Sequence, residues 1–364
     1  MGKKIRIAMV AVDLSRTGIS TVIMNYCRNI DLSKFQIDLL VGNHIVPEYR
    51  KECNQLGIKI IELPFKFDST IGFYFGLLKN LSSKKYDIVH VHGNSAMITP
   101  ELFTAFIKRI KVRIAHSHNT TCDHKKIDKL LRPIFKMLYT DGFACSTLAG
   151  KWLFQNDKFE VIPNGFETDR FMFSEINRNQ IRNELNLNDK FVIGHIGQFN
   201  DQKNHRFLLK IFEKIGKQRQ DAVLLLVGNG PDKQEVCKLI DKHPFSDRII
   251  VYGETEYPEK IYSAMDVFAF PSKFEGLGIV LLEAQINGLK CIASNVVPPE
   301  AIISKNVELY SLEENIENWC NAIIKAKSIE RKEFFTKYKD EIEKYDILKN
   351  AEQLMGIYNR CIKK

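Results

Sequence analysis

The sequence predicts an α/β protein built of two successive doubly wound parallel-sheet domains. Short runs of β-branched and other apolar residues recur every twenty to thirty positions, and segments with helical spacing lie between them. The pattern restarts near residue 191. Alternating strands and helices form right-handed crossovers and a parallel sheet. The length of 364 residues also suits two domains, since a domain typically takes roughly 100–200 residues.

The first series of elements predicts a Rossmann-like domain over residues 1–170. The expected strands are 5–12, 36–41, 58–63, 87–92, 112–118, 142–146 and 159–162, and helical spacing appears at 18–30, 71–83, 94–110 and 124–139. Residues 5–12 follow basic residues, but Asp13 ends the apolar run, so we expect a first strand there and not a signal peptide. The polar stretch 171–188 predicts a linker with a short helix.

The second series predicts a second Rossmann-like domain over residues 189–345. The expected strands are 191–197, 223–227, 248–252, 266–270 and 290–293, with helices at 204–219, 231–242, 278–288 and 313–327. Apolar residues at helical spacing in 346–364 predict a final helix that packs across the domain boundary. Ligands of such sheets bind beyond the carboxyl ends of the strands, so we expect one site in a cleft between the two domains.

The net excess of basic over acidic residues lies entirely in the first half of the chain. The whole sequence has 53 Lys and Arg against 44 Asp and Glu, a net charge of +9. Residues 1–186 hold 27 basic and 18 acidic side chains, which leaves 26 of each for residues 187–364. A basic first domain favours an anionic partner. No recognised nucleic-acid-binding motif accompanies the charge, so we expect no nucleic-acid partner.

Cysteine usage and hydropathy predict a reduced, cytoplasmic protein. The eight cysteines form no C-x-x-C pair, which is typical of core thiols and not of a disulfide scaffold. No stretch reaches the roughly 18 apolar residues that a spanning helix needs. Any membrane contact is therefore expected to be peripheral, at the inner face of the cell membrane.

Residues 266–288 carry the most informative chemistry in the chain. An expected strand ends at Pro271, a loop holds Glu275 and two glycines, and a helix with Glu283 follows. Glycines at a helix start leave backbone N–H groups and the positive end of the helix dipole for a phosphate. Eight helical positions would separate the carboxylates by about 12 Å, whereas a retaining glycosidase pair needs about 5–5.5 Å. Two hydroxyl-rich parts of one extended ligand suit the pair better than a single reacting bond.

Glu275 and Glu283 in the context PSKFEGLGIVLLEA resemble the signature of retaining nucleotide-sugar glycosyltransferases of family 4, which have the two-domain GT-B fold. Other pieces that match in order are Thr17-Gly18-Ile19-Ser20, His118, Ile162–Gly165, Gly197–Asn204, Gly228–Pro231 and Ser263–Asp266. The resemblance covers nearly the whole chain and is closest to branches that build bacterial exopolysaccharide or capsule. It implies sugar transfer from a nucleotide diphosphate, most simply a UDP-sugar, to a saccharide or lipid-linked saccharide acceptor.

The resemblance also implies roles for individual residues. Glu283 would bind the ribose hydroxyls and Glu275 the hydroxyls of the donor sugar, while Lys203 would neutralise the leaving phosphate. His118 would contact the donor sugar. The remaining donor-site residues would act mainly through their backbone: Gly18, Tyr252, Gly253, Gly276, Leu277, Gly278 and Ile279. No cofactor is implied, and the absence of an Asp-x-Asp pair predicts catalysis without a metal.

One departure from the family concerns Gln198, where Arg is common. A glutamine supplies no charge, so Arg16 or Lys273 would have to substitute, or activity would be lower or lost. An inactive homologue that stabilises a partner enzyme is therefore the alternative function. A sugar-nucleotide epimerase of the same fold should lack the two glutamates of this loop.

Histidines end two neighbouring expected strands, at His90, His92, His116 and His118. Alternate residues of a strand share a face, so these imidazoles are candidate zinc ligands. The commoner alternative is that His90 and His116 are packed or hydrogen-bonded and His92 lines the cleft.

Lysines and aromatic residues of the first domain raise the hypothesis of an anionic membrane contact. Lysines occur along the expected helix 124–139, and aromatic residues lie beside lysines in 64–79. Such a composition suits a membrane interface, whereas the periodicity of Ile71, Phe75 and Leu78 favours core positions for these three.

Overall fold

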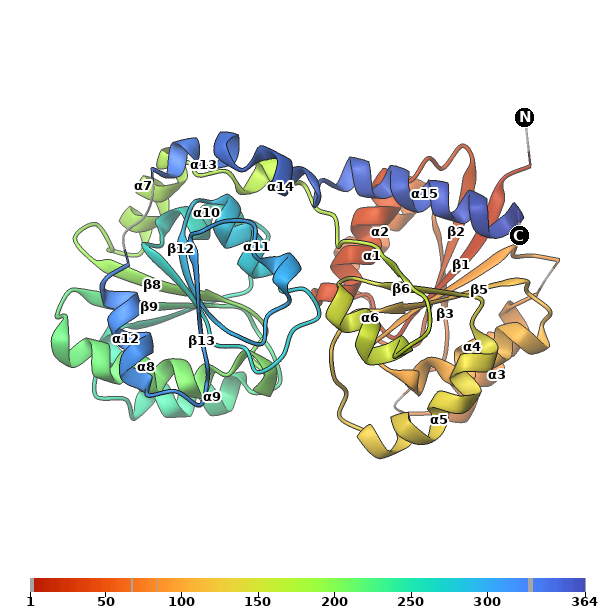
Figure 1. Cartoon of the computed structure of the whole chain (residues 1–364), viewed down its shortest axis with the longest axis horizontal. Helices are drawn as coiled ribbons and strands as arrows, with labels where there is room; N and C mark the ends of the chain where they lie inside the picture. Colours follow the sequence, from red (N-terminus) through yellow and green to blue (C-terminus); the bar gives the residue numbers. More distant parts are fainter. Residues whose placement is uncertain (1–2, 67, 83, 327–329, 364) are drawn as a thin grey trace. The chain divides into compact units, whose positions relative to one another are not determined.

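The computed structural model describes residues 3–66, 68–82, 84–326 and 330–363. The chain forms two compact units, each with its own sheet (Figure 1). Unit 1 comprises Met1–Phe166 with Lys344–Lys364, and unit 2 comprises Glu167–Glu343. The two parallel-sheet domains expected from the sequence are thereby confirmed.

Unit 1 holds a seven-stranded parallel sheet with the order β3-β2-β1-β4-β5-β6-β7. Its strands are β1 (Ile5–Ala11), β2 (Phe35–Val41), β3 (Lys59–Glu62), β4 (Ile88–Gly93), β5 (Val112–Ser117), β6 (Asp141–Ala144) and β7 (Glu160–Val161). Its helices are α1 (Gly18–Asn29), α2 (Pro47–Leu56), α3 (Thr70–Asn80), α4 (Thr99–Ile107), α5 (Lys125–Leu138), α6 (Thr147–Phe154) and α15 (Ile347–Lys363). The strand order reverses between β1 and β4, and such a switch point is where ligands bind in open α/β sheets.

The C-terminal helix α15 belongs to unit 1, where it lies against α1 (Figure 1). A bridge between Phe166 and Asp346 joins the chain leaving unit 1 to the chain returning to it. The Tyr358 hydroxyl of α15 reaches the Nδ1 atom of His90 on β4 at 2.7 Å. The last helix therefore completes the core of the first domain.

Unit 2 holds a six-stranded parallel sheet with the order β10-β9-β8-β11-β12-β13. Its strands are β8 (Phe191–Ile196), β9 (Ala222–Val227), β10 (Ile249–Gly253), β11 (Val267–Phe270), β12 (Lys290–Ser294) and β13 (Val307–Tyr310). Its helices are α7 (Glu175–Glu184), α8 (His205–Gln218), α9 (Lys233–Asp241), α10 (Pro258–Ala264), α11 (Ile279–Ile286), α12 (Ile316–Ile324), α13 (Arg331–Lys337) and α14 (Lys339–Glu343). Here the strand order reverses between β8 and β11.

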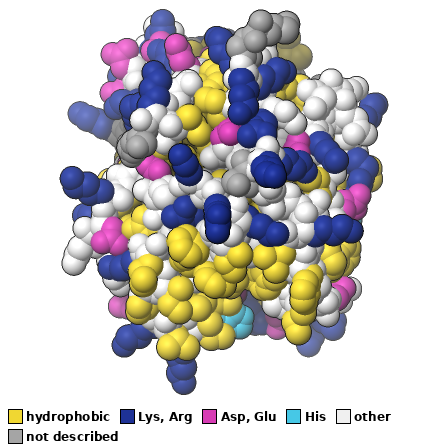
Figure 2. Space-filling model, turned by 90° about the vertical axis from the view of Figure 1, so that its right-hand side faces the viewer, with side chains coloured by type: hydrophobic (Ala, Val, Ile, Leu, Met, Phe, Trp, Pro, Cys, Tyr) yellow, Lys and Arg dark blue, Asp and Glu magenta, His cyan; other side chains and the backbone are white. Residues whose placement is uncertain are grey.

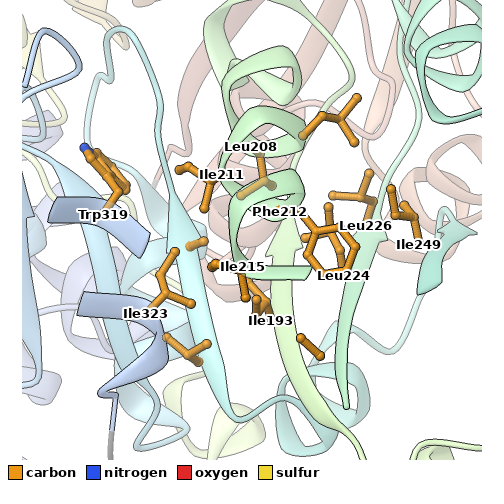
Figure 3. Close-up of a cluster of buried hydrophobic side chains, with 14 of the residues drawn as sticks. Ile193, Leu208, Ile211, Phe212, Ile215, Leu224, Leu226, Ile249, Trp319 and Ile323 are labelled. Atoms are coloured by element: carbon orange, nitrogen blue, oxygen red, sulfur yellow. The ribbon is translucent and has the colours of Figure 1, made fainter. Parts of the chain in front are cut away.

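The core of unit 2 forms where α8 and α12 cover the sheet (Figure 3). Leu208, Ile211, Phe212 and Ile215 follow the helical period and are all buried on one face of α8. The strands beneath them are buried along their whole length, which is typical of parallel sheets covered by helices. Each fully buried side chain of this kind contributes roughly 1.5–3 kcal/mol to stability.

The segment expected as a linker contains α7, which packs against α10. Arg178 and Arg182 of this helix both form ion pairs with Asp266, at 2.7 and 3.2 Å. The Asp266 carboxylate also accepts a hydrogen bond from the backbone N–H of Val192, at 2.8 Å. The polar helix is thus attached to β8 and to the start of β11.

Two details of the sequence interpretation are wrong. Ile71 and Phe75 are 73% and 66% exposed, whereas Phe73 and Leu77 are buried. The period of α3 was therefore correct, but its buried face lies two residues further along. Helix α9 begins at Lys233, so Pro231 precedes the first turn and does not start it.

The eight cysteines are free thiols, and six of them are buried. Among the described residues, no helix combines the length and apolar character needed to cross a membrane.

Candidate donor site and histidine array

Two loops meet at the switch point of unit 2 and hold Lys203 and Glu275. The Lys203 Nζ atom lies 2.7 Å from Glu275 Oε1 and 4.8 Å from the centre of the Phe270 ring. The side chains are only 13% and 5% exposed. An ion pair so removed from water interacts far more strongly than a surface pair, and it holds the two side chains together between the loops.

Hydrogen bonds to backbone groups connect these two loops and order the one that holds Lys203. Asn204 has left-handed backbone geometry, with φ of 56°, and its side chain donates to the Pro271 carbonyl at 3.2 Å. The Lys273 N–H donates to the Gln202 carbonyl at 2.8 Å. The Asn200 side chain accepts from the Lys203 N–H at 3.1 Å and so fixes the start of the lysine. These bonds hold Lys203 in place before any ligand arrives.

Glycines let the backbones of neighbouring strand ends approach closely. A Cβ atom at Gly228 would lie 2.1 Å from the Gly197 carbonyl oxygen, and one at Gly230 would lie 2.4 Å from that of Phe199. Gly228 also has φ of +138°, a conformation that other residues rarely adopt. The edge of the sheet beside Lys203 is therefore lined by main chain, which suits a nucleotide diphosphate.

Helix α11 begins at Ile279, directly after Glu275, Gly276, Leu277 and Gly278, as the sequence predicted. Gly278 caps it in left-handed geometry, with φ of +85°. The helix N-terminus and its dipole thus follow the loop that holds the ion pair, and this arrangement favours an anion.

Glu283 lies within the same helix and is partly buried. Its Oε2 atom accepts a hydrogen bond from the Tyr262 hydroxyl at 2.8 Å. Burial raises the pKa of Glu283 to about 7, and the Tyr262 hydrogen bond opposes this rise. The carboxyl group therefore changes charge near neutral pH, which makes it a candidate ligand-binding group. Tyr262 was not predicted as a site residue, because the sequence around it does not indicate a contact with Glu283, which lies 21 positions away.

The other predicted donor residues surround this edge of the sheet. Gly253 ends β10 with φ of +87°, and its carbonyl accepts from the Gly228 N–H at 2.7 Å. Tyr252 beside it is partly buried. Gln198 is exposed and accepts a hydrogen bond from the Asn200 amide at 3.0 Å. Gln198 thus lies beside the loop that holds Lys203.

Both cations considered as substitutes for the missing arginine already have acidic partners. The Nη2 atom of Arg16 lies 3.5 Å from Oε1 of Glu48. Lys273 pairs with Asp201.

Gly18 begins α1 at the switch point of unit 1. A Cβ atom added there would meet no described atom within 4 Å. The preceding loop is held by the buried Ser20 hydroxyl, which lies 3.0 Å from both Asp13 Oδ1 and Thr17 Oγ1. The helix start is therefore ordered and open.

Four histidines of unit 1 form a buried array: His90 and His92 lie on β4, His116 lies on β5, and His118 directly follows β5. His92 pairs with His116 in the strand register. His90 Nε2 lies 3.1 Å from His116 Nδ1, and His92 Nδ1 lies 2.9 Å from His118 Nε2. This confirms that His90 and His116 are hydrogen-bonded. Burial lowers the pKa of both His90 and His118 to about 3 and keeps the array neutral.

Ring geometry bears on whether this array binds a metal. The ligand atoms of His90, His92 and His116 lie within 4.8 Å of one another. The His90 ring is inclined by only 23° to the His92 ring and by 12° to the His116 ring. Both ring nitrogens of His90 already have hydrogen-bond partners, the Tyr358 hydroxyl and His116 Nδ1, so a hydrogen-bonded stack accounts for the array better than a zinc site.

Known proteins resemble this chain along nearly its whole length. The model "Glycosyltransferase Family 4" matches residues 16–170, and "Glycosyl transferases group 1" matches residues 177–349. EpsF of Bacillus subtilis, named as a glycosyltransferase, is 28% identical over 97% of this chain and 96% of its own length. The capsular polysaccharide biosynthesis glycosyltransferase CapH of Staphylococcus aureus is 27% identical over 85% of this chain and 86% of its own.

One further relative and one solved structure have a name or a title that states their ligands. A UDP-Gal:alpha-D-GlcNAc-diphosphoundecaprenol alpha-1,3-galactosyltransferase of Escherichia coli is 26% identical over 69% of this chain and 68% of its own. The crystal structure of Anabaena HepE with UDP and glucose superposes with a TM-score of 0.81 at 15% identity, over 98% of this chain and 99% of that one. The fold is thus that of the GT-B glycosyltransferases. The chain carries a family 4 glycosyltransferase domain followed by a group 1 glycosyl transferase domain and is homologous to bacterial exopolysaccharide and capsule glycosyltransferases.

Proposed function

We propose that the chain is a retaining, metal-independent glycosyltransferase that moves a sugar from a UDP-sugar to a growing bacterial surface polysaccharide. The observation that carries this proposal is the buried Lys203–Glu275 pair at the switch point of unit 2, beside the N-terminus of α11. A cation, a carboxylate and helix amides within two adjoining loops suit the diphosphate and the sugar hydroxyls of one ligand.

In this proposal the negative charge that builds on the leaving diphosphate is stabilised by Lys203 and by backbone N–H groups, those of Gly276, Leu277, Gly278 and Ile279. The anomeric carbon then loses its bond to the phosphate oxygen and gains one to the acceptor oxygen. The acceptor proton passes to the departing phosphate on the same face, so the anomeric configuration is kept and UDP leaves. No covalent intermediate is needed, and stabilisation of the departing charge supplies most of the acceleration.

Glu275 and Glu283 would bind the two hydroxyl-bearing parts of the donor. The pair with Lys203 holds the Glu275 carboxylate in the loop, where it accepts hydrogen bonds from the transferred sugar. Glu283 accepts bonds from the ribose hydroxyls once it is ionised. Tyr252 and Gly253 would hold the base. The roles of Gly18 and His118 in unit 1, and the absence of a cofactor, stay predictions.

The acceptor is proposed from the relatives. The name of CapH supports a surface polysaccharide, and the name of the E. coli relative supports an acceptor on a diphosphate-linked lipid. The structure of HepE with UDP and glucose supports a UDP-sugar donor.

The test is UDP release from a panel of UDP-sugars in the presence of a bacterial membrane extract and EDTA. Wild type should release UDP, and Glu275→Gln and Lys203→Ala should each abolish the release. Glu213→Gln and Lys217→Ala alter an exposed ion pair on α8 and serve as matched controls that keep full activity. Substantial release by both site variants would refute the assigned residues.

A second candidate function is that of an inactive homologue that stabilises a partner enzyme. The uncharged Gln198 favours it, as do the acidic partners already held by Arg16 and Lys273. Thermal stabilisation by UDP without transfer from any donor would support this alternative.

A further inference from the structure

Three neighbouring helices of unit 1 expose apolar side chains. Helix α4 contacts both α3 and α5. Ile71 and Phe75 on α3 are 73% and 66% exposed, and Leu130 and Met137 on α5 are 76% and 80% exposed. We define the apolar face as these four residues with Phe103, Phe106, Ile107, Ile127 and Ile134, all about half exposed. Figure 2 shows hydrophobic side chains gathered over the lower part of unit 1, below a belt of Lys and Arg.

The exposed apolar residues of α5 lie on one stripe of the helix. Ile127, Leu130, Ile134 and Met137 are three or four residues apart, so they share one side. Phe135 and Leu138 face the core instead and are buried. The helix thus has a second apolar stripe that no core requires, which is typical of a helix that lies in a membrane interface.

The surface around the apolar face carries basic side chains. The only acidic residues within the described α3, α4 and α5 are Glu101 and Asp128, and both are buried in ion pairs, with Lys66 and with Arg132. The exposed lysines of α3 and α5 are Lys79, Lys125, Lys126, Lys129 and Lys136. The exposed surface of these helices is therefore apolar and cationic.

The turn after α4 continues the same chemistry. Lys108 and Arg109 follow Phe106 and Ile107 directly, and Lys111 comes two positions after Arg109. A surface hollow of about 370 Å³ beside this turn is lined by both kinds of side chain. Basic groups thus border the apolar face at α4 as well as at α5.

We propose that the apolar face docks unit 1 on a bilayer that contains anionic phospholipid. Leu130 and Met137 enter the acyl region, while Lys125, Lys126 and Lys129 of α5 and the basic residues of the α4 turn pair with lipid phosphates. A second copy of the chain is a poorer occupant, because a symmetric dimer would bring the two basic borders together. This inference rests on the proposed function, in which a lipid-linked acceptor would lie at such a surface.

Sedimentation of the full chain with vesicles tests the proposal without donor or acceptor. The protein should bind vesicles of phosphatidylcholine with phosphatidylglycerol at least tenfold more tightly than phosphatidylcholine alone, and added salt should weaken this binding. Leu130→Ser with Met137→Ser should weaken it by tenfold or more. Lys125→Gln, Lys126→Gln and Lys129→Gln together should weaken it about a hundredfold, since each surface lysine contributes about fivefold near an anionic membrane.

Matched controls lie on unit 2. Ile176→Ser removes an apolar side chain that is 80% exposed on α7, and Lys210→Gln, Lys238→Gln and Lys242→Gln remove three exposed lysines. Both controls should bind anionic vesicles as wild type does, and every variant should keep the wild-type thermal midpoint. Binding of wild type to neither kind of vesicle would overturn the proposal. So would equal losses in the controls, or a dimer that only the apolar variants disrupt. Failure of vesicle binding with intact UDP release would leave the proposed function standing.

Discussion

The ionisation of Glu283 predicts that donor affinity depends on pH. Its pKa of about 7 means that the carboxyl is about 90% ionised at pH 8 and about 10% ionised at pH 6. If the ribose hydroxyls donate to the carboxylate, only the ionised form binds well. Affinity should therefore fall about tenfold from pH 8 to pH 6, a loss of about 1.4 kcal/mol in binding free energy.

Isothermal titration with UDP-glucose measures this effect directly. UDP-glucose is preferable to UDP, because its diphosphate has no terminal phosphate to titrate near neutral pH. Glu283→Gln should bind weakly with little dependence on pH. Tyr262→Phe removes the hydroxyl that stabilises the carboxylate, so its pKa should rise further and the binding midpoint should move to higher pH. A flat wild-type profile, or the same profile in wild type and Glu283→Gln, would show that ionisation of Glu283 does not control donor binding.

Two further predictions concern stability. Burial lowers the pKa of His90 and His118 to about 3. Between about pH 6.5 and pH 3, these two histidines are therefore protonated in the unfolded chain but not in the folded unit. Each of them lowers the free energy of unfolding of unit 1 by about 1.4 kcal/mol for every pH unit below about 6.5. Hydrogen exchange should show unit 1 opening more readily at pH 5 than at pH 7, and equal protection at both would contradict the buried neutral array. Gly228→Ala places a Cβ atom 2.1 Å from a carbonyl oxygen and should lower the free energy of unfolding by about 3 kcal/mol or more. Gly356→Ala on α15, where no described atom lies within 4 Å of the new Cβ, should raise it by up to about 1 kcal/mol, and similar thermal midpoints for the two variants would argue against the close approach.

The hydrophobic period made most of the fold predictable, because buried parallel strands and amphipathic helices alternate along the chain. Elements without that signal were missed. Helix α2 buries only Cys53, and β13 is at most half-buried along its length, so neither has a continuous apolar pattern. On α3 the period alone left two apolar faces possible, and packing of Phe73 against Gly42, directly after β2, decided between them.

The candidate site was predictable where a local motif indicates ligand binding, as it does at Glu275 and Glu283. Lys203 and Glu275 come from different loops, and only the folded unit brings them to 2.7 Å. The contact of Tyr358 with His90 spans 268 positions of sequence, which no local pattern reveals. Tyr262 likewise acquires its role only through α10 packing beside α11.

Sugar transfer from a UDP-sugar through Lys203 and Glu275 can be followed at the anomeric carbon itself. Proton NMR of a reaction with membrane-extract acceptor and EDTA follows the anomeric signal of the donor directly. We expect an α-linked donor to be consumed, UDP to appear and the product signal also to be α, with no turnover by Glu275→Gln and full turnover by Glu213→Gln. A β-linked product, or unchanged turnover by Glu275→Gln, would contradict this expectation.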